Sequence, residues 1–472
     1  MYGRLRAAIF LVLAGVSLQA GCAARPSVAT RPNADHNPIS SEQAVENFDA
    51  AWNLINERHF DPEFNGVDWV ALRDELRPKA ASAATLGELR DVIRTMLKRL
   101  GQSHFSLFPR ERLDAISPDG LDDSDAVADI GVELRLLNGQ IVVFAVEQDG
   151  PADRAGVKPG WLVESVDGHR VADIVNLLTG DIDPRHADLR VSRQFTRRLN
   201  GTAGSSVRVE FRNADDKTVA RSFKRARNSG TPTTIGSNFP TVFAKLQSRR
   251  IERSDLGVQV GWIHFNLWFL PVAKPFDRAV DEMRDVDGMV IDLRGIGGGV
   301  MALIMGVAGH FLDERVPLGI LKTRTSELRL TANPRRVNPD GKRVKPYAGP
   351  LAILVDAHSG SASEIFAGGM QSIGRARVFG QTSLGAALPA AMQSLPNRDV
   401  LYHAFADFLD ANGASIEGRG VIPDQPVELT RADLLAGRDA PLEAAVRWIA
   451  AEKSRRPAGQ DSDADRVYNS KP

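Results

Sequence analysis

The stretch around Ser361 constrains the fold most, because an apolar segment there leads through a turn of small residues into a helical pattern. Residues 351–355 (LAILV) have the branched apolar composition of a buried strand, and Gly360 and Ala362 keep the turn free of bulky side chains. A helix is expected to begin near Ser363, whose hydroxyl can cap it. This α/β unit places Ser361 at a helix N-terminus, where free backbone N–H groups can stabilise an oxyanion. Ser361 is therefore either a nucleophile or part of an ordinary capped turn.

A second apolar segment, residues 288–292 (GMVID), leads into a glycine-rich loop. The loop ends in consecutive glycines at 297–299, and a helical pattern follows over residues 300–312. Glycines let the backbone approach a ligand closely and point its amides at that ligand. No lysine follows the glycines, so a Walker-type nucleotide site is not expected. A further block, residues 417–424 (EGRGVIPD), closes this region of the chain.

Together, the strand with its glycine loop, the serine turn (SASE) and the closing GVIPD segment resemble the tail-specific, or carboxyl-terminal processing, serine protease family. The motifs occur in the order of that family, and the resemblance spans about residues 42–451. It implies an α/β multidomain protein with a helical N-terminal domain, a PDZ-like β-rich domain and a crotonase-like α/β protease core. It also implies that Ser361 is the nucleophile. The amides of Gly298 and Ala362 would form the oxyanion hole, with Gly299 as the alternative glycine.

One departure from the family affects the mechanism. In the Ser-Lys branch the base is a lysine after the nucleophile helix, and Ala386 stands at that position here. The chain has no lysine between Lys345 and Lys453, so a small shift of alignment does not supply one. Ile296 likewise stands where the family usually has asparagine. The protein is then either inactive or uses another base.

Another base is available in residues 100–104 (LGQSH), which resemble the motif of the family's tricorn-like branch with its Ser-His-Ser-Glu tetrad. The resemblance implies that His104 is the general base for Ser361. It gives Ser103 the role of an orienting hydroxyl and Glu417 that of the carboxylate which polarises this hydroxyl. Imidazole can take the serine proton and return it to the leaving amine once a partner fixes its tautomer. Activity is then expected to fall at acid pH with an apparent pKa in the histidine range.

Each tetrad residue also has a simpler interpretation. Ser103 and His104 can form a polar helix end, and Glu417 lies in a glycine-rich connection where a solvated acid is ordinary. His358 is the rival base, although it lies on the same turn as Ser361 and is expected to face away.

Residues 125–212 resemble a PDZ domain. The most recognisable part is 146–168 (VEQDGPADRAGVKPGWLVESVDG), and Ile130, Gly131 and Val132 match the carboxylate-loop strand of that module. A PDZ groove adds a peptide as an extra strand and offers backbone amides to its C-terminal carboxylate. The resemblance therefore implies a polypeptide ligand, and the alternative is a PDZ fold that serves only as a spacer.

Composition and periodicity divide the rest of the chain. Apolar residues at helical spacing predict the N-terminal helical domain, and the basic segment after the PDZ-like domain is expected to be a flexible connection. The expected division is a signal peptide 1–21, a tether 22–40, a helical N-terminal domain 41–110, a PDZ-like domain 125–212, a linker 213–238, a serine protease core 239–452 and a disordered tail 453–472.

The N-terminus has the pattern of a secretion signal. Two arginines precede an apolar stretch, residues 7–18, that is too short to span a bilayer comfortably. The single cysteine, Cys22, follows the sequence LQAG, which resembles a bacterial lipoprotein signal cleaved before a cysteine that becomes lipidated. Because Ala23 is not aspartate, the expected destination is the periplasmic face of the outer membrane. Gln19 departs from the aliphatic residue usual in that signal, so the alternative is a leader cleaved nearby that releases a secreted protein.

The composition limits the partners. The 59 basic and 59 acidic residues cancel, which argues against nucleic acid as the main partner. The histidines show no metal-ligand spacing and no cysteine pair exists, so neither a metal nor another cofactor is expected. The sequence thus predicts a serine peptidase of the bacterial cell envelope that cleaves polypeptides. The alternative is a pseudoprotease that captures peptides or small apolar ligands without cleaving them.

Overall fold

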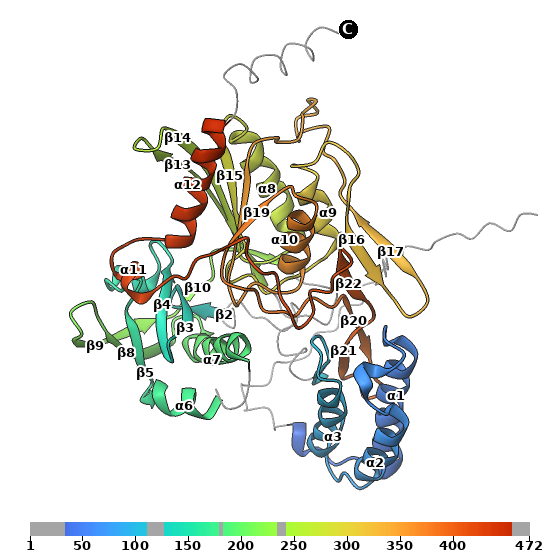
Figure 1. Cartoon of the computed structure of the whole chain (residues 1–472). Coiled ribbons are helices and arrows are strands. Elements are labelled where there is room, and N and C mark those ends of the chain that lie inside the picture. Colours follow the sequence, from blue (N-terminus) through green and yellow to red (C-terminus); the bar gives the residue numbers. More distant parts are fainter. Residues whose placement is uncertain (1–33, 111–126, 179–182, 234–241, 456–472) are drawn as a thin grey trace, which may run out of the picture.

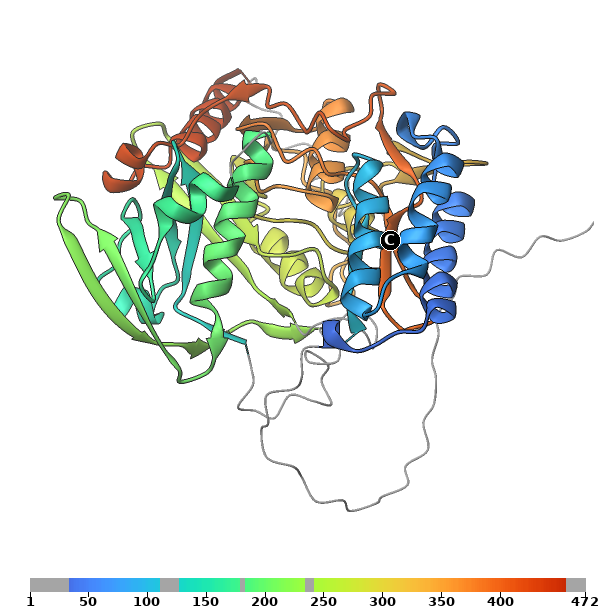
Figure 2. The same cartoon turned by 90° about the horizontal axis from the view of Figure 1, so that it is seen from below.

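The computed structural model describes residues 34–110, 127–178, 183–233 and 242–455. Figure 1 shows N-terminal helices, a β-rich domain and a larger α/β core, and Figure 2 places the helices and the β-rich domain on opposite sides of the core. This arrangement confirms the fold class expected from the sequence. None of the helices within the described ranges combines the length and the apolar character that crossing a bilayer requires.

The N-terminal part is a unit of three helices, as the apolar spacing predicted. The side chains of Ser40, Asp68 and Thr85 each accept a hydrogen bond from the first turn of one helix, which explains where the helices begin. Their apolar faces meet in a common core that includes Phe48 and Ile93, both fully buried. The helices are α1 (Ser41–Arg58), α2 (Trp69–Ala81) and α3 (Leu86–Arg99).

Two contacts attach this unit to the α/β core. The short strand β1 (Ser106–Phe108) pairs antiparallel with β21 (Val400–Ala404), which also pairs with β20 (Ala390–Ser394). In addition, Arg90 of α3 and Asp399 form an ion pair at 2.7 Å in which both side chains are buried. The segment that carries Ser103 and His104 lies between these two attachments, so its position relative to the core is fixed.

The PDZ-like domain is built on a sheet with the order β3-β4-β5-β8-β9, and β6 pairs with β5. Helix α7 packs along β3, the strand at the edge of this sheet. The strands are β3 (Val132–Leu137), β4 (Gln140–Val146), β5 (Leu162–Val166), β6 (His169–Arg170), β8 (Ser206–Arg212) and β9 (Thr218–Lys224). The helices are α5 (Pro151–Arg154), α6 (Val171–Leu178) and α7 (Pro184–Leu199).

The expectation that 213–238 is a flexible connection is wrong for its described residues. Strand β9 pairs with β8 along its whole length, and β10 (Ala226–Arg227) pairs with β2 (Val127–Asp129). A tight turn that begins at Asn213 joins β8 to β9. The Asn213 side chain stabilises this turn, since it accepts hydrogen bonds from two of the turn's backbone N–H groups. Lys224 and Arg227 are exposed on strands, Arg221 and Arg225 are half-buried, and the PDZ-like sheet continues past residue 212.

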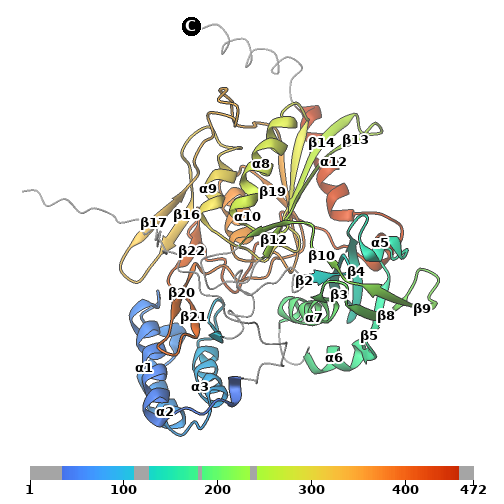
Figure 3. The ribbon, with the colours of Figure 1, turned by 180° about the vertical axis from the view of Figure 1, so that it is seen from behind.

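The core is a sheet with the order β13-β14-β15-β18-β19-β23, in which neighbours are parallel except β13 and β14. Strands β15 and β18 are buried at every position, which explains their uninterrupted apolar sequences. Figures 1 and 3 show α12 on one face and α8, α9 and α10 on the other. The strands are β13 (Leu246–Arg253), β14 (Val258–Phe265), β15 (Gly288–Asp292), β18 (Leu351–Val355), β19 (Arg377–Gly380) and β23 (Gln425–Pro426). The helices are α8 (Leu270–Glu282), α9 (Ala302–Ala308), α10 (Ala362–Ser372) and α12 (Ala440–Arg455).

A smaller sheet and one short helix also belong to the core. Strands β17, β16 and β22 form a small antiparallel sheet beside the main one, and α11 precedes α12. Their bounds are β16 (Pro317–Lys322), β17 (Glu327–Thr331), β22 (Asp407–Asp410) and α11 (Arg431–Leu435).

The topology brings the two expected motifs together. Strands β15 and β18 are parallel neighbours, so their carboxyl ends lie at the same edge of the sheet. The glycine loop follows β15 and the serine turn follows β18. The edge beyond the carboxyl ends of parallel strands is where α/β proteins usually bind ligands. The helix after the glycine loop is α9, which covers only Ala302–Ala308 and is therefore shorter than the helical pattern predicted over residues 300–312.

Candidate active site

The predicted tetrad residues come from three distant segments and meet at this edge. His104 Nε2 lies 3.3 Å from Ser361 Oγ, and His104 Nδ1 lies 2.6 Å from Ser103 Oγ. Ser103 Oγ donates a hydrogen bond to Glu417 Oε2 at 2.9 Å. The side chains therefore form a continuous chain of hydrogen bonds from Glu417 to Ser361.

The carboxylate of Glu417 also holds the backbone around it. It accepts hydrogen bonds from the N–H groups of Ser103 at 2.8 Å and Ala387 at 2.9 Å. It thereby ties the segment of Ser103 to the loop after β19. Burial raises the pKa of Glu417, whereas these hydrogen bonds lower it. The interpretation of Glu417 as a freely solvated acid does not fit these contacts.

Ser361 has an unusual backbone conformation for a residue with a side chain. Its φ of 53° and ψ of −117° lie outside the regions that residues other than glycine favour. Strain of this kind costs about 1–3 kcal/mol and collects at functional sites. Helix α10 begins at Ala362 with Ser361 at its N-cap, so the expectation that Ser363 caps the helix is wrong. The Ser363 hydroxyl donates instead to the carbonyl of Ile296 in the glycine loop, at 2.9 Å.

Glu364 is a site residue whose role the sequence did not indicate. Its fully buried carboxylate accepts hydrogen bonds from the Ser383 hydroxyl at 2.5 Å and from the N–H groups of Gly385 at 2.6 Å and Ala386 at 3.0 Å. It also accepts one from the N–H of Ser361 at 3.0 Å. Burial raises the pKa of Glu364 to about 7, against the effect of these donors. The side chain thus fixes Ser361 relative to the loop that carries Ala386.

We expect Glu364→Gln to lower kcat by roughly 10- to 100-fold with little change in KM, because an amide NH₂ would face a backbone N–H where a carboxylate oxygen now accepts. One mispaired buried donor costs about 1–3 kcal/mol, which corresponds to that loss. Steady-state kinetics on a fluorogenic peptide measure the effect. Ser383→Ala is the matched control, since it removes one donor and leaves the carboxylate, and its loss should be smaller. A Glu364→Gln enzyme with wild-type kcat would contradict the positioning role.

The expected oxyanion-hole residues lie at different distances from the nucleophile. A Cβ added to Gly298, whose φ is +113°, would stand 2.6 Å from Ser361 Cβ and 3.3 Å from the N atom of Ala362. A Cβ on Gly299 would meet the carbonyl of Trp268 instead. Gly298 and Ala362 therefore flank Ser361, the expected nucleophile, whereas Gly299 packs against Trp268.

Burial sets the electrostatics of His104, the expected base. It lowers the pKa of His104 to about 4, so the imidazole is neutral over the ordinary pH range. The ring of Tyr402 in β21 lies beside it, with ring centres 5.5 Å apart. A neutral imidazole with a free lone pair can accept a proton from a serine hydroxyl. Ala386 occupies the place of the family lysine, and its carbonyl accepts a hydrogen bond from the Ser361 N–H at 2.8 Å.

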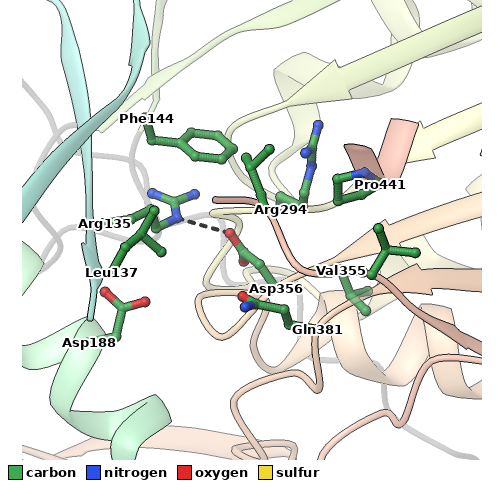
Figure 4. Close-up of a pocket in the computed structure, with 12 residues that line it drawn as sticks. Arg135, Leu137, Phe144, Asp188, Arg294, Val355, Asp356, Gln381 and Pro441 are labelled. Carbon is green, nitrogen blue, oxygen red and sulfur yellow. Dashed lines mark hydrogen bonds and ion pairs between the residues drawn. The ribbon is translucent and has the colours of Figure 1, made fainter. Parts of the chain in front are cut away.

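His358, the rival base, is directed toward the PDZ-like domain. Its Nε2 lies 2.9 Å from Asp188 Oδ1 of α7, although the two groups are not aligned for a hydrogen bond. Beside this contact, Arg135 Nε of β3 donates to Asp356 Oδ2 at 2.9 Å, and Figure 4 shows these two side chains pointing at each other across the domain boundary. The turn before Ser361 is therefore in contact with the PDZ-like domain through two residues.

The expected peptide-binding residues lie at the start of β3. Ile130 is buried, and Val132 is half-buried. The Gly131 N–H donates to Asp129 Oδ1 at 2.8 Å, and its carbonyl accepts from the Glu147 N–H at 2.8 Å. The Gly131 amide is thus engaged by the domain's own carboxylate. Within the described part of the chain, no group of three or more His, Cys, Asp or Glu residues is placed to hold a metal ion.

Three family models match parts of the chain. The peptidase family S41 model matches residues 259–427, the tricorn protease C1 domain matches residues 41–98, and the PDZ domain matches residues 128–182. The first of these spans contains the glycine loop, Ser361 and Glu417. The second ends just before Ser103 and His104.

Full-length relatives and solved structures agree with these models. The chain is 26% identical over 390 residues to carboxyl-terminal-processing peptidase 3 of Arabidopsis thaliana, covering 79% of this chain and 67% of the relative. It is 26% identical over 408 residues to the carboxy-terminal processing protease CtpB of Bacillus subtilis, covering 84% and 71%. Its fold is similar to that of the photosystem II D1 C-terminal processing protease, with a TM-score of 0.55, 23% identity and coverage of 87% and 98%.

Proposed function

The chain belongs to peptidase family S41, the carboxyl-terminal processing proteases, and carries a tricorn protease C1 domain and a PDZ domain; from this premise we propose that Ser361 is its nucleophile and His104 its general base. The observation that supports the proposal is the hydrogen-bond chain from Glu417 through Ser103 and His104 to Ser361. Ala386 at the lysine position supports this choice over the Ser-Lys mechanism of the related branch.

The direction of each hydrogen bond in this chain determines where the protons are and how they move. Ser103 Oγ donates to Glu417, so its lone pairs are free to accept the Nδ1–H of His104. This assigns the proton to Nδ1 and leaves the lone pair of Nε2 facing the Ser361 hydroxyl. Nε2 takes the hydroxyl proton as Ser361 Oγ attacks the substrate carbonyl, and then gives it to the leaving amine. A water molecule, activated by the same nitrogen, hydrolyses the acyl-enzyme.

The developing oxyanion would be bound by backbone amides. Ala362 N–H lies at the start of α10, where the helix dipole favours negative charge, and Gly298 packs directly on Ser361. A donor of this kind contributes about 3–4 kcal/mol to transition-state stabilisation in serine peptidases. The PDZ domain, in this proposal, engages the polypeptide substrate.

Labelling with a fluorophosphonate probe tests the proposed site. The purified chain without its leader should react covalently at Ser361, as seen by mass spectrometry of the labelled peptide, and denatured casein should slow the reaction by competition. A folded protein that neither labels nor cleaves casein would favour the alternative, a peptide-binding pseudoprotease, for which Ala386 and Ile296 are the supporting observations.

The location is a separate proposal, since residues 1–33 lie outside the described part of the chain. We infer that Cys22 is lipidated and holds the protein on the periplasmic face of the outer membrane. The support is the LQAG sequence before Cys22 and the alanine after it. If Gln19 prevents this processing, the chain is secreted instead.

Mass spectrometry and fractionation of a Gram-negative host test the anchor. The wild-type N-terminal peptide should carry the mass of acyl chains, and Cys22→Ser should move the protein from the membrane to the soluble fraction. Gln19→Leu restores the usual aliphatic residue and should leave the wild-type location unchanged. A wild type without acyl mass, together with a Cys22→Ser variant that stays with membranes, would refute the anchor.

A further inference from the structure

Three consecutive backbone amides of the glycine loop have no hydrogen-bond partner among the described residues. They are the N–H groups of Gly297, Gly298 and Gly299. Gly298 packs directly on Ser361, so its amide is the expected oxyanion donor. Glycine has no side chain that restricts its backbone, and φ is +113° at Gly298 and +147° at Gly299. The direction of these amides is therefore set by the groups that hold the loop from outside.

The carbonyl groups of the same loop are held. The Ile296 carbonyl accepts hydrogen bonds from the Gly360 N–H at 3.0 Å and from the Ser363 hydroxyl at 2.9 Å. The Gly298 carbonyl accepts one from the Trp268 N–H at 3.1 Å. Each carbonyl shares a rigid peptide plane with the N–H of the next residue, so a held carbonyl also fixes the direction of that amide. The peptide plane that carries the Gly298 N–H lies between these two held planes.

The side chain of Trp268 holds the loop a second time, through Ser363. Its Nε1–H donates to Ser363 Oγ at 2.9 Å, and both side chains are buried. A hydroxyl that accepts a hydrogen bond on one lone pair keeps its own proton to donate. The indole therefore directs the Ser363 O–H toward the Ile296 carbonyl. Trp268 thus contacts the loop on both sides of the Gly298 N–H, through its backbone and through its side chain.

Packing fixes the orientation of the indole. Trp268 lies in the connection between β14 and α8 and is 1% exposed. Its ring meets that of Phe265 edge-on at 4.9 Å and that of Phe366 in α10 at 5.3 Å, measured between ring centres. These contacts are apolar, so phenylalanine at position 268 would keep most of them and would lose the N–H. The contribution of the N–H can therefore be measured separately from that of the packing.

We propose that Trp268 and Ser363 are positioning residues, which hold the glycine loop so that its amides bind the oxyanion of the transition state. The inference rests on the proposed function, because it concerns the oxyanion site of the same serine. It adds that an indole outside both the tetrad and the glycine loop controls the rate of the chemical step. Both side chains are buried and act through the loop, so their effect should appear in kcat and not in KM.

The first measurement tests the hydrogen bond itself and needs no activity. The chain has six tryptophans, so a ¹H–¹⁵N spectrum of the labelled protein contains few indole signals, and Trp268→Phe identifies one by its disappearance. Ser363→Ala should shift that signal upfield, because the indole N–H loses its acceptor, and should leave the other indole signals in place. A Trp268 signal that does not move in Ser363→Ala would overturn the inference.

The second measurement is kinetic and uses a fluorogenic peptide made from a casein site that the wild type cleaves. Trp268→Phe should lower kcat about 10-fold and Ser363→Ala roughly 10- to 100-fold, with KM changed by less than about twofold, because a displaced donor weakens the transition state alone. The matched control is Trp52→Phe. It removes the N–H of another buried indole, which donates to the Trp69 carbonyl at 2.9 Å in the helical domain. Melting temperatures compare the structural cost of the two lost hydrogen bonds, and the control should keep the wild-type kcat.

Two further results separate positioning from a general loss of structure. A peptide aldehyde forms a hemiacetal with the nucleophile, and the oxygen of this hemiacetal lies in the oxyanion site. Its Ki should therefore rise by the same factor by which kcat/KM falls. In the Ser363→Ala background, Trp268→Phe should lower kcat by less than about twofold, since the hydroxyl through which the indole acts is already absent.

The outcomes distinguish this inference from the proposed function. A Trp268→Phe variant that keeps the wild-type kcat, or whose kcat and aldehyde affinity fall no more than those of Trp52→Phe, overturns the inference alone. A full further loss of kcat in the double variant does the same. A wild type that neither reacts with a fluorophosphonate nor cleaves casein refutes the proposed function and the inference with it, whereas the shift of the indole signal still reports whether the hydrogen bond exists.

Discussion

Ser361→Ala is expected to abolish cleavage of an unfolded protein such as casein and to leave the fold intact. The Ser361 hydroxyl lies within reach of His104 and beside Gly298, and no neighbouring hydroxyl can replace it: Ser363 donates to the glycine loop and Ser359 to the carbonyl of Leu293. Removal of the nucleophile from a serine peptidase lowers kcat by about 10⁶-fold, which places the variant below detection.

The measurement is release of fluorescent fragments from labelled casein, with the melting temperature recorded for the same samples. The melting temperature of Ser361→Ala should change little or rise. The substitution removes only one partly buried hydroxyl, and it keeps the strained backbone conformation of residue 361. Ser372→Ala, at the other end of α10, is the matched control and should keep full activity. Wild-type proteolysis by purified Ser361→Ala would eliminate Ser361 as the nucleophile.

His104→Ala is expected to lower kcat/KM by about 10⁴-fold or more with little loss of stability. Among the described residues, the side chain of His104 makes hydrogen-bond contacts with Ser103 and Ser361 only, so its removal is expected to leave the core of the protein unchanged. Ser103→Ala and Glu417→Gln should cost less, roughly 10- to 1,000-fold, because these residues orient the base and transfer no proton to the substrate. Rates on a fluorogenic peptide establish this order, and a His104→Ala enzyme with near wild-type activity would refute the tetrad.

The pH profile gives an independent check on the same residue. A histidine acts as a base only when neutral, so activity is lost as pH falls through its pKa. The sequence suggested an apparent pKa in the ordinary histidine range. Burial lowers the pKa of His104 to about 4, so the acid limb that this residue sets is expected well below that range. In the residual activity of His104→Ala this limb should be absent. A partial loss of activity near pH 7 would belong to Glu364, whose pKa burial raises to about 7.

Restoring the family lysine should not replace the histidine. In the double variant with His104→Ala and Ala386→Lys, the new ammonium would lie near the Glu364 carboxylate, which already contacts the backbone of residue 386. A nearby carboxylate stabilises the charged form of lysine and raises its pKa, whereas a base must be neutral. The double variant is therefore expected to be as inactive as His104→Ala.

The local motifs could be recognised from the sequence, because they depend on short-range chemistry. The composition of 351–355 and 288–292 predicted two buried strands, and both occur. The glycines and the serine turn predicted sharp turns at their ends, and the order of the motifs indicated the protease family. Local patterns predicted the boundaries of the elements less well. Helix α10 begins earlier than expected, α9 is shorter than expected, and residues 213–238 contain strands where a flexible connection was expected.

The meeting of the site residues was decided by the tertiary structure. His104 and Ser361 are 257 positions apart, and Ser103 and Glu417 are 314 apart, so no local propensity relates them. They come together because β1 pairs with β21 and Arg90 pairs with Asp399, which fix the end of the helical domain against the core. The role of Glu364 depends on the path of the loop at 383–386. The sequence by itself determined which chemical groups the protein has and the turns that carry them. The distances between these groups, their burial and their charge states were set by packing between segments far apart in the chain. Those quantities depend on which surfaces pack against one another and exclude water.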